Sequence, residues 1–196
     1  MKPPEGGLLG DVMAIESMKE GLTKYMGVIG SDHAYIHDGI AFTVLGITGS
    51  IAAGATTKFR FTTPTVASGK YIHWRPAHID GISTGVTYEL YESPTASAGS
   101  TATPINRNRL SSNTSAMQLF NSGATVSGGT LIQIIGGGTG STGVTNAGGT
   151  GGAQNELVLA QNTEYAIVLT NRSGSTATLI VYEFFWYEET SGLDEA

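Results

Sequence analysis

Short apolar runs that alternate with polar residues recur along the chain from Gly39 onward, a pattern typical of β-strands. In "TKFRFTT", Phe59 and Phe61 fall on one face while Lys58 and Arg60 fall on the other, as a half-buried strand requires. Such runs, without a convincing helix among them, predict a β-sandwich or barrel. The expected strands are IAFTVLGI, TKFRFTT, KYIHWRPAHI, VTYELYES, SAMQLFN, LIQII, ELVLA, EYAIVLTN and ATLIVYEFFWYEE.

The last of these runs is apolar on both faces. Phe184 and Trp186 share one face, and Phe185 and Tyr187 share the other. Such a strand is either central in a buried sheet or covered by another subunit, and the pattern leaves both alternatives open. On the second alternative, the subunit-interface candidates are Phe184, Phe185, Trp186 and Tyr187.

The beginning of the chain follows a different pattern, so we expect an N-terminal arm over residues 1–30 ahead of a sandwich domain over residues 31–196. Apolar residues in the arm recur at spacings of three and four, which predicts a short amphipathic helix from Asp11 to Lys19, capped by Asp11. The helix either covers one end of the domain or docks into a neighbouring subunit. The candidate contact residues are Leu8, Leu9, Val12, Met13, Ile15 and Met18.

Composition narrows the class of protein further. The 196 residues suffice for one main domain, and 28 glycines with only 13% charged residues suit an all-β chain with long loops. The net charge of -6 disfavours binding to a polyanion, so we expect no direct nucleic-acid partner. Cysteine is absent, so packing alone must stabilise the core. No run approaches the roughly 20 apolar residues of a membrane helix. We therefore expect no membrane association, and a protein kept or assembled inside a cell.

A glycine-rich stretch beginning at Leu131 holds Gly138, Gly140 and Gly143 in the spacing of a dinucleotide-binding turn. That turn must open a helix, yet the next residues include Gly148 and several more glycines, each costing roughly 1 kcal/mol in a helix interior. A long loop between two strands is the better interpretation, and we expect no cofactor.

Two polar stretches contain potential metal ligands. "SDHAYIHDG" offers Asp32, His33, His37 and Asp38, but its histidines match a zinc pair only if the segment is helical. We expect a polar connection there, and no metal. "HWRPAHIDG" contains His73, Arg75, His78 and Asp80, for which a surface or interface role is favoured, with Pro76 marking an edge strand or a bulge.

Catalytic patterns are weak throughout the chain. No serine sits in a G-x-S-x-G elbow, and a catalytic triad does not follow from scattered Ser, His and Asp residues. Glu89, Glu92 and Glu183 leave open a carboxylate pair of the kind that glycosidases use, because their separation is invisible in sequence. The expectation is a protein that is not an enzyme.

The closing segment "LVLAQNTEYAIVLTNRSGSTATLIVYEFFWYEE" resembles the closing hairpin of structural proteins from tailed bacteriophages. It combines an L-x-x-N-T-x-Y strand, a turn with Asn and Gly, and an aromatic strand that ends in W-Y-E. "TYELYESPTASAGST" is similar to a strand of these proteins that runs into a variable outer loop, and the resemblance covers roughly residues 70 to 190. The residues that carry it are Asn162, Thr163, Tyr165, Asn171, Gly174, Trp186, Tyr187 and Glu188.

This resemblance implies a jelly-roll head decoration (cement) protein, that is, an all-β, jelly-roll-like antiparallel β-sandwich with an N-terminal arm or short helix. It further implies a homotrimer on the outer capsid surface of the virion, assembled in the host cytoplasm, with the major capsid protein as partner. The N-terminal arm would then contact the capsid or an adjacent trimer. The expected function is to clamp capsid subunits against the pressure of packaged DNA.

An alternative function is that of a receptor- or carbohydrate-binding head of a tail fibre or head fibre. Four aromatic residues could stack on sugar rings in such a role. They are Trp74, Tyr88, Tyr91 and Tyr187.

Overall fold

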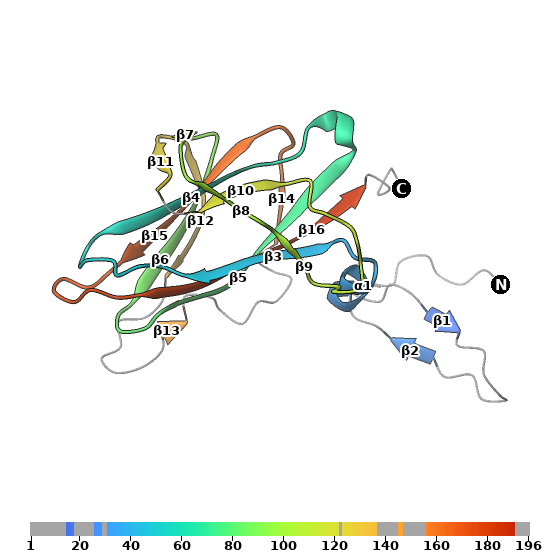
Figure 1. The fold of residues 1–196 in the computed structure, drawn as a ribbon, viewed down its shortest axis with the longest axis horizontal. Coiled ribbons are helices and arrows are strands. Elements are labelled where there is room, and N and C mark those ends of the chain that lie inside the picture. Colours follow the sequence, from blue (N-terminus) through green and yellow to red (C-terminus); the bar gives the residue numbers. More distant parts are fainter. Residues whose placement is uncertain are drawn as a thin grey trace, which may run out of the picture.

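The computed structural model describes residues 15–17, 26–28, 31–121, 123–136, 145–146 and 156–190. Within these residues, the chain forms two antiparallel β-sheets that pack face to face, together with two separate two-stranded sheets (Figure 1). One α-helix, α1 (Ser31–His37), and one 3-10 turn, η1 (Val66–Ser68), accompany them. Of the two all-β architectures that the alternating pattern predicts, a sandwich or a barrel, the sandwich is confirmed.

All nine predicted strands are present. They are β3 (Ala41–Ile47), β4 (Thr56–Thr62), β5 (Lys70–Gly81), β6 (Val86–Glu92), β10 (Gln118–Asn121), β12 (Thr130–Gly136), β14 (Leu157–Leu159), β15 (Glu164–Asn171) and β16 (Ile180–Thr190). Seven short strands lie outside the predicted runs. They are β1 (Ile15–Ser17), β2 (Met26–Val28), β7 (Thr95–Ser97), β8 (Ser100–Ala102), β9 (Ile105–Asn106), β11 (Thr125–Ser127) and β13 (Thr145–Asn146).

The order of strands in the two sheets is that of a jelly roll. Sheet I runs β13-β5-β16-β3-β9, with β14 also paired to β5, and sheet II runs β12-β6-β15-β4-β10-β8. Eight principal strands, β3, β4, β5, β6, β12, β14, β15 and β16, can be counted in chain order. Sheet I then contains strands 1-8-3-6, and sheet II contains strands 2-7-4-5. Packing two sheets in this way limits exposed sheet edges.

Aromatic side chains fill the space between the sheets. Phe61 of β4 stacks on Trp74 of β5, with ring centroids 4.7 Å apart, and Trp74 stacks in turn on Trp186 of β16 at 6.1 Å. The buried indole N–H of Trp74 donates a 2.9 Å hydrogen bond to the hydroxyl of Tyr88. Because the chain has no cysteine, packing of these aromatic side chains and of the aliphatic residues around them stabilises the core without disulfides.

Two of the residues on which the phage resemblance rests, Tyr165 and Asn171, make hydrogen bonds that connect separate parts of the fold. The Tyr165 hydroxyl donates to Glu92 at 2.7 Å and accepts from the Ala160 N–H at 2.9 Å. The Asn171 side chain is fully buried and makes five hydrogen bonds at the start of the last hairpin turn. The resembling motif is thus a set of structural residues, and it bears on the fold more directly than on a binding site.

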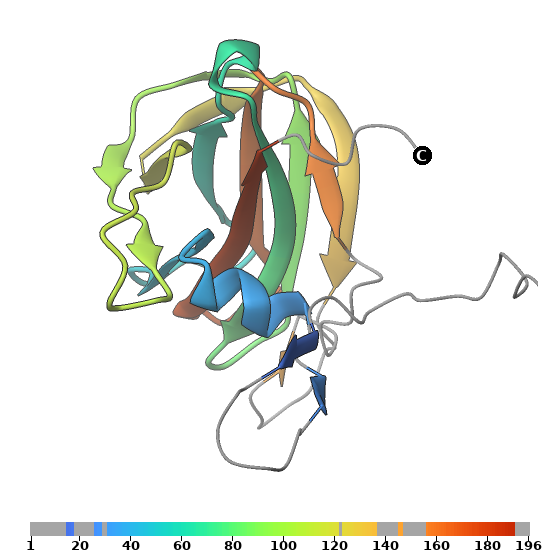
Figure 2. The same cartoon turned by 90° about the vertical axis from the view of Figure 1, so that its right-hand side faces the viewer.

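The prediction of a polar connection at "SDHAYIHDG" is wrong, because the segment forms α1. Tyr35 and Ile36 of the helix pack against a small apolar cluster on the outer face of sheet I. Gly39 then ends the turn, since its φ of +69° is readily adopted only by glycine. Tertiary packing stabilises a helix that would be too short by itself, and Figure 2 shows it across one end of the sandwich.

The helix predicted from Asp11 to Lys19 is also contradicted at its centre. Ile15–Ser17 form β1, which pairs antiparallel with β2, with Glu16 opposite Gly27. A strand pair satisfies backbone groups between two segments, whereas an isolated helix of nine residues has a costly nucleus. Of the proposed contact residues, only Ile15 is among the described residues; Leu8, Leu9, Val12, Met13 and Met18 lie outside them.

Candidate functional site

The last strand is buried on both faces within a single chain. β16 lies between β5 and β3, so it is a central strand of sheet I. Phe184 and Trp186 are 0% exposed in the core between the sheets, while Phe185 and Tyr187 are 5% and 4% exposed beside α1. The central-strand alternative explains the two apolar faces, and these four side chains offer almost no surface to a second subunit.

A polar cluster surrounds Tyr187 on the outer face of sheet I. Its hydroxyl donates a 2.5 Å hydrogen bond to Glu156, whose same oxygen lies 2.8 Å from Nδ1 of His73. The His73 and Tyr35 rings both stack on the Tyr187 ring, with centroids 4.4 and 4.0 Å away. Burial, reinforced by the Glu156 carboxylate, raises the pKa of Tyr187, which therefore remains a hydrogen-bond donor at neutral pH.

This cluster lines a hollow of about 910 Å³ beside α1. A histidine next to a carboxylate is a common acid–base pair. Here, however, Glu156 also accepts the Tyr187 hydroxyl, and the second nitrogen of His73 lies 3.5 Å from Glu189. The polar atoms of these side chains therefore bond to one another, and their contacts connect β5, β16 and the residue before β14. Sequence analysis missed Glu156, because its role depends on β14 pairing with β5.

Glu188 is a second buried carboxylate in the same hollow. It accepts from Ser115 at 2.5 Å and from the Ala116 N–H at 2.9 Å, and it pairs with Lys70 at 3.0 Å. These bonds attach the loop before β10 to sheet I. A glutamate on the inward face of an otherwise aromatic strand is the sequence signal that could have identified it.

A β-bulge places all four polar residues of "HWRPAHIDG" on one face. Glu183 pairs with His78 and Phe184 with Pro76, so Ala77 is an extra residue in β5. His73 and Arg75 before the bulge, and His78 and Asp80 after it, therefore face outward. Of the two alternatives predicted for Pro76, an edge strand or a bulge, the bulge is confirmed. His73 and Asp80 are buried on this face, and among the four polar side chains only His78 is widely exposed, so the predicted surface position applies to His78 alone. His78 contacts Asp80, while His73 and Arg75 contact Glu156.

The two histidines of α1 come together because the segment is helical. Nε2 of His33 and Nε2 of His37 lie 2.8 Å apart on the exposed side of the helix. Among the described residues, however, no group of three or more His, Cys, Asp or Glu side chains is placed to hold a metal ion.

The three glutamates considered for a glycosidase carboxylate pair lie on two different sheets. Glu89 and Glu92 lie on β6 of sheet II, where they accept hydrogen bonds from Tyr91 and Tyr165. Glu183 lies on β16 of sheet I, on the face that points away from sheet II, where it accepts from Thr43. A pair that uses Glu183 is therefore excluded by the fold.

The aromatic residues proposed to stack on sugars are not available as a platform. Trp74 and Tyr88 are 0% exposed in the core, and Tyr187 lies under α1. Tyr91 is part of the outer face of sheet II and donates to Glu89 at 2.8 Å. This prediction was wrong, because an apolar face of a strand does not reveal whether a second sheet covers it.

A group of aliphatic residues on the outer face of sheet I is exposed instead. Leu45 and Ile47 of β3 are 58% and 57% exposed, and Ile105 of β9 is 39% exposed. All three point away from sheet II, beyond the part of the face that α1 covers. We call these three residues the β3 patch.

Comparison with known proteins provides no relative for this chain. No protein-family model, no curated protein and no solved structure matches it. In the part of the chain that the structure describes, there is also no helix long and apolar enough to cross a membrane.

Proposed function

We propose that the protein is a non-enzymatic structural component of a phage virion that decorates and stabilises the capsid as a homotrimer. The jelly-roll fold and the structural roles of the hairpin residues support the resemblance on which this proposal rests. The outer capsid surface is the proposed location, and the major capsid protein is the proposed partner.

The observation that carries the proposal is the β3 patch. Leu45 and Ile47 are each more than half exposed to solvent, and they lie on the same face of sheet I. Exposed aliphatic residues grouped on one face are typical of protein–protein contact surfaces. In a chain with only 13% charged residues, such a patch is suited to self-association more than to steering a charged ligand.

Sedimentation velocity tests the self-association. We expect a trimer for the wild-type protein and a monomer for the double variant Leu45→Asp with Ile47→Asp, because two buried carboxylates would oppose the contact. Val158→Asp is the matched control, since Val158 is 61% exposed on the same outer face but lies on β14. It should remain trimeric. A monomeric wild type, or a double variant that stays trimeric, would contradict this part of the proposal.

Titration onto undecorated capsids tests the attachment itself. The proposal predicts saturable binding and a higher temperature of capsid disruption, because a ligand that binds only the intact shell stabilises it. The capsids must come from the phage that encodes the chain. If binding does not saturate and the disruption temperature does not change, the decoration function is wrong.

A further inference from the structure

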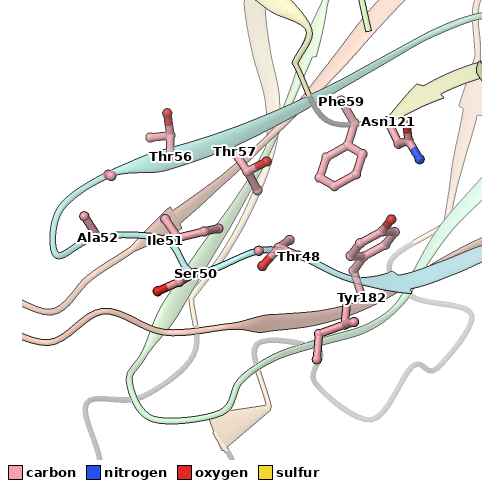
Figure 3. Close-up of a pocket in the computed structure, with 12 residues that line it drawn as sticks. Thr48, Ser50, Ile51, Ala52, Thr56, Thr57, Phe59, Asn121 and Tyr182 are labelled. Carbon is pink, nitrogen blue, oxygen red and sulfur yellow. The ribbon is translucent and has the colours of Figure 1, made fainter. Parts of the chain in front are cut away.

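A second hollow, separate from the polar cluster around Tyr187 and sharing only Ile47 with the β3 patch, lies between the two sheets at one edge of the sandwich. It has a volume of about 420 Å³ and is bounded by β3, β4, β10, β16 and the loop that follows β3. Figure 3 shows Phe59 and Tyr182 next to each other at its inner end, with Asn121 beside them and Thr48, Ser50 and Thr57 around the opening.

The hollow exists because both sheets are incomplete at this edge. In sheet I, β9 pairs only with Phe42 and Thr43, which leaves the second half of β3 without an outer neighbour among the described residues. In sheet II, β10 pairs with β4 only as far as Arg60. Thr56–Phe59 of β4 and the end of β3 therefore both lie at open sheet edges, and the hollow between them opens to solvent there.

One polar atom in this hollow is buried without a partner in the part of the chain that the structure describes. Oδ1 of Asn121 accepts no hydrogen bond there. The Tyr182 hydroxyl lies beside it on a buried side chain, and the hydroxyls of Thr57 and Ser50 lie at the more exposed opening. A buried polar atom without a partner costs about 1–3 kcal/mol, so a group that bonds to it is favoured.

Gly46 allows the Tyr182 hydroxyl to reach this position. Gly46 lies directly opposite Tyr182 in the β3–β16 pair, and a Cβ at Gly46 would come within 2.6 Å of the hydroxyl oxygen. The ring therefore lies across the bare backbone of β3, with its hydroxyl toward the open edge. Burial raises the pKa of Tyr182, so this hydroxyl remains a donor at neutral pH.

The chemistry of the lining limits what can bind. None of the residues that line the hollow carries a charge, so an ion would lose its hydration without gaining a charged partner. The floor is apolar, formed by Ile51 together with the Phe59 and Tyr182 rings, whose centroids are 4.8 Å apart. Hydroxyl and amide groups surround that floor. The volume is within the usual range for small-molecule sites.

From this geometry we propose that the hollow between β3 and β4 binds a neutral hydroxylated ligand, of the size of a single sugar unit. Its C–H face would lie over the apolar floor, and its hydroxyls would bond to Asn121, Tyr182 and Thr57. The site does not depend on the proposed decoration function, and it uses none of the aromatic residues first considered for sugar binding.

Saturation-transfer NMR on the full chain tests this site. The probes are D-glucose, D-galactose and N-acetyl-D-glucosamine, with D-galacturonate as a charged counterpart. We expect saturation transfer to at least one neutral sugar and a much weaker signal for galacturonate. Tyr182→Phe and Thr57→Val each remove one hydroxyl with little change of shape, and each should weaken binding by about tenfold, the effect of losing about 1.4 kcal/mol.

Tyr71→Phe is the matched control, because Tyr71 is exposed on β5 and does not line the hollow. It should bind sugar as the wild type does, and circular dichroism should show that all three variants remain folded. If none of the neutral sugars binds, the site is wrong. It is equally wrong if binding persists unchanged in both Tyr182→Phe and Thr57→Val, or if galacturonate binds as well as galactose.

Discussion

At the scale of single residues, the fold depends on a few buried polar groups that have all their hydrogen bonds. The Asn171 amide nitrogen donates to the carbonyl oxygens of Ile51, Ala52 and Thr176. Its oxygen accepts from the Thr84 hydroxyl and the Ser173 N–H. One side chain thereby connects the loop after β3, the loop before β6 and the final hairpin turn.

Replacing this amide should therefore destabilise the whole sandwich. Asn171→Ala leaves several buried groups without partners, and we expect the free energy of unfolding to fall by about 3 kcal/mol. Urea denaturation measures it. Gln118→Ala, which removes an exposed carboxamide from β10, should change the stability by less than about 0.5 kcal/mol. Similar losses in the two variants would show that the Asn171 network is unimportant.

The buried tyrosines predict a specific response to alkaline pH. Burial raises the phenol pKa of Tyr88 well above its ordinary value of 10.0, while the unfolded chain titrates near that value. Above pH 10 the unfolded state loses protons that the folded state keeps, so stability is fully present below pH 10 and declines above it. Each such tyrosine contributes a slope of about 1.4 kcal/mol per pH unit.

Denaturation at a series of pH values between 9 and 11, the range set by the ordinary phenol pKa of 10.0, measures this decline. Tyrosinate absorbance should rise together with unfolding, because Tyr88 ionises only when the core opens. The account would be contradicted if Tyr88 titrated near pH 10 while the protein remained folded.

At the scale of elements, the local pattern of apolar residues predicted the long strands well. It did not predict the elements that form only because they pack against or pair with another part of the chain. Each long strand has an alternating apolar face, as with Phe59 and Phe61, and this periodicity is visible in the sequence. The short helix α1 has no such signal, since it depends on Tyr35 and Ile36 meeting the outer face of sheet I. Short strands such as β9 depend on a neighbouring edge to pair with.

The bulge in β5 yields a sharp element-scale prediction. Deleting Ala77 would make Pro76 and His78 consecutive opposite Phe184 and Glu183, which gives a regular ladder with Ile79 still toward the core and His78 and Asp80 still outward. We expect this variant to remain folded at 25 °C by circular dichroism. Deleting Val168 from the regular strand β15 would make Ile167 and Leu169 consecutive, so that only one of them could face the core, and should abolish the folded state. An unfolded Ala77 deletion, or a folded Val168 deletion, would contradict the role assigned to the bulge.

At the scale of the whole molecule, the sequence predicted the architecture better than its surfaces. Leu45 of β3 and Ala41 of the same strand both point to the outer face of sheet I, yet α1 covers Ala41 and leaves Leu45 exposed. The hollow beside Tyr182 arises where β9 and β10 stop short, which no residue pattern encodes. Which outward-facing residues are exposed, and where a hollow forms, depends on how the strands and the helix pack together, and this is visible only in the structure.

The proposed capsid decoration is tested most directly by imaging. Cryo-electron microscopy of capsids incubated with the purified protein should show additional density on the outer surface, in three-fold clusters into which the jelly roll fits with the β3 patches in contact. Capsids incubated with the Leu45→Asp, Ile47→Asp variant should lack these clusters. Bare capsids after incubation with the wild-type protein, or density confined to the tail, would contradict the proposed function.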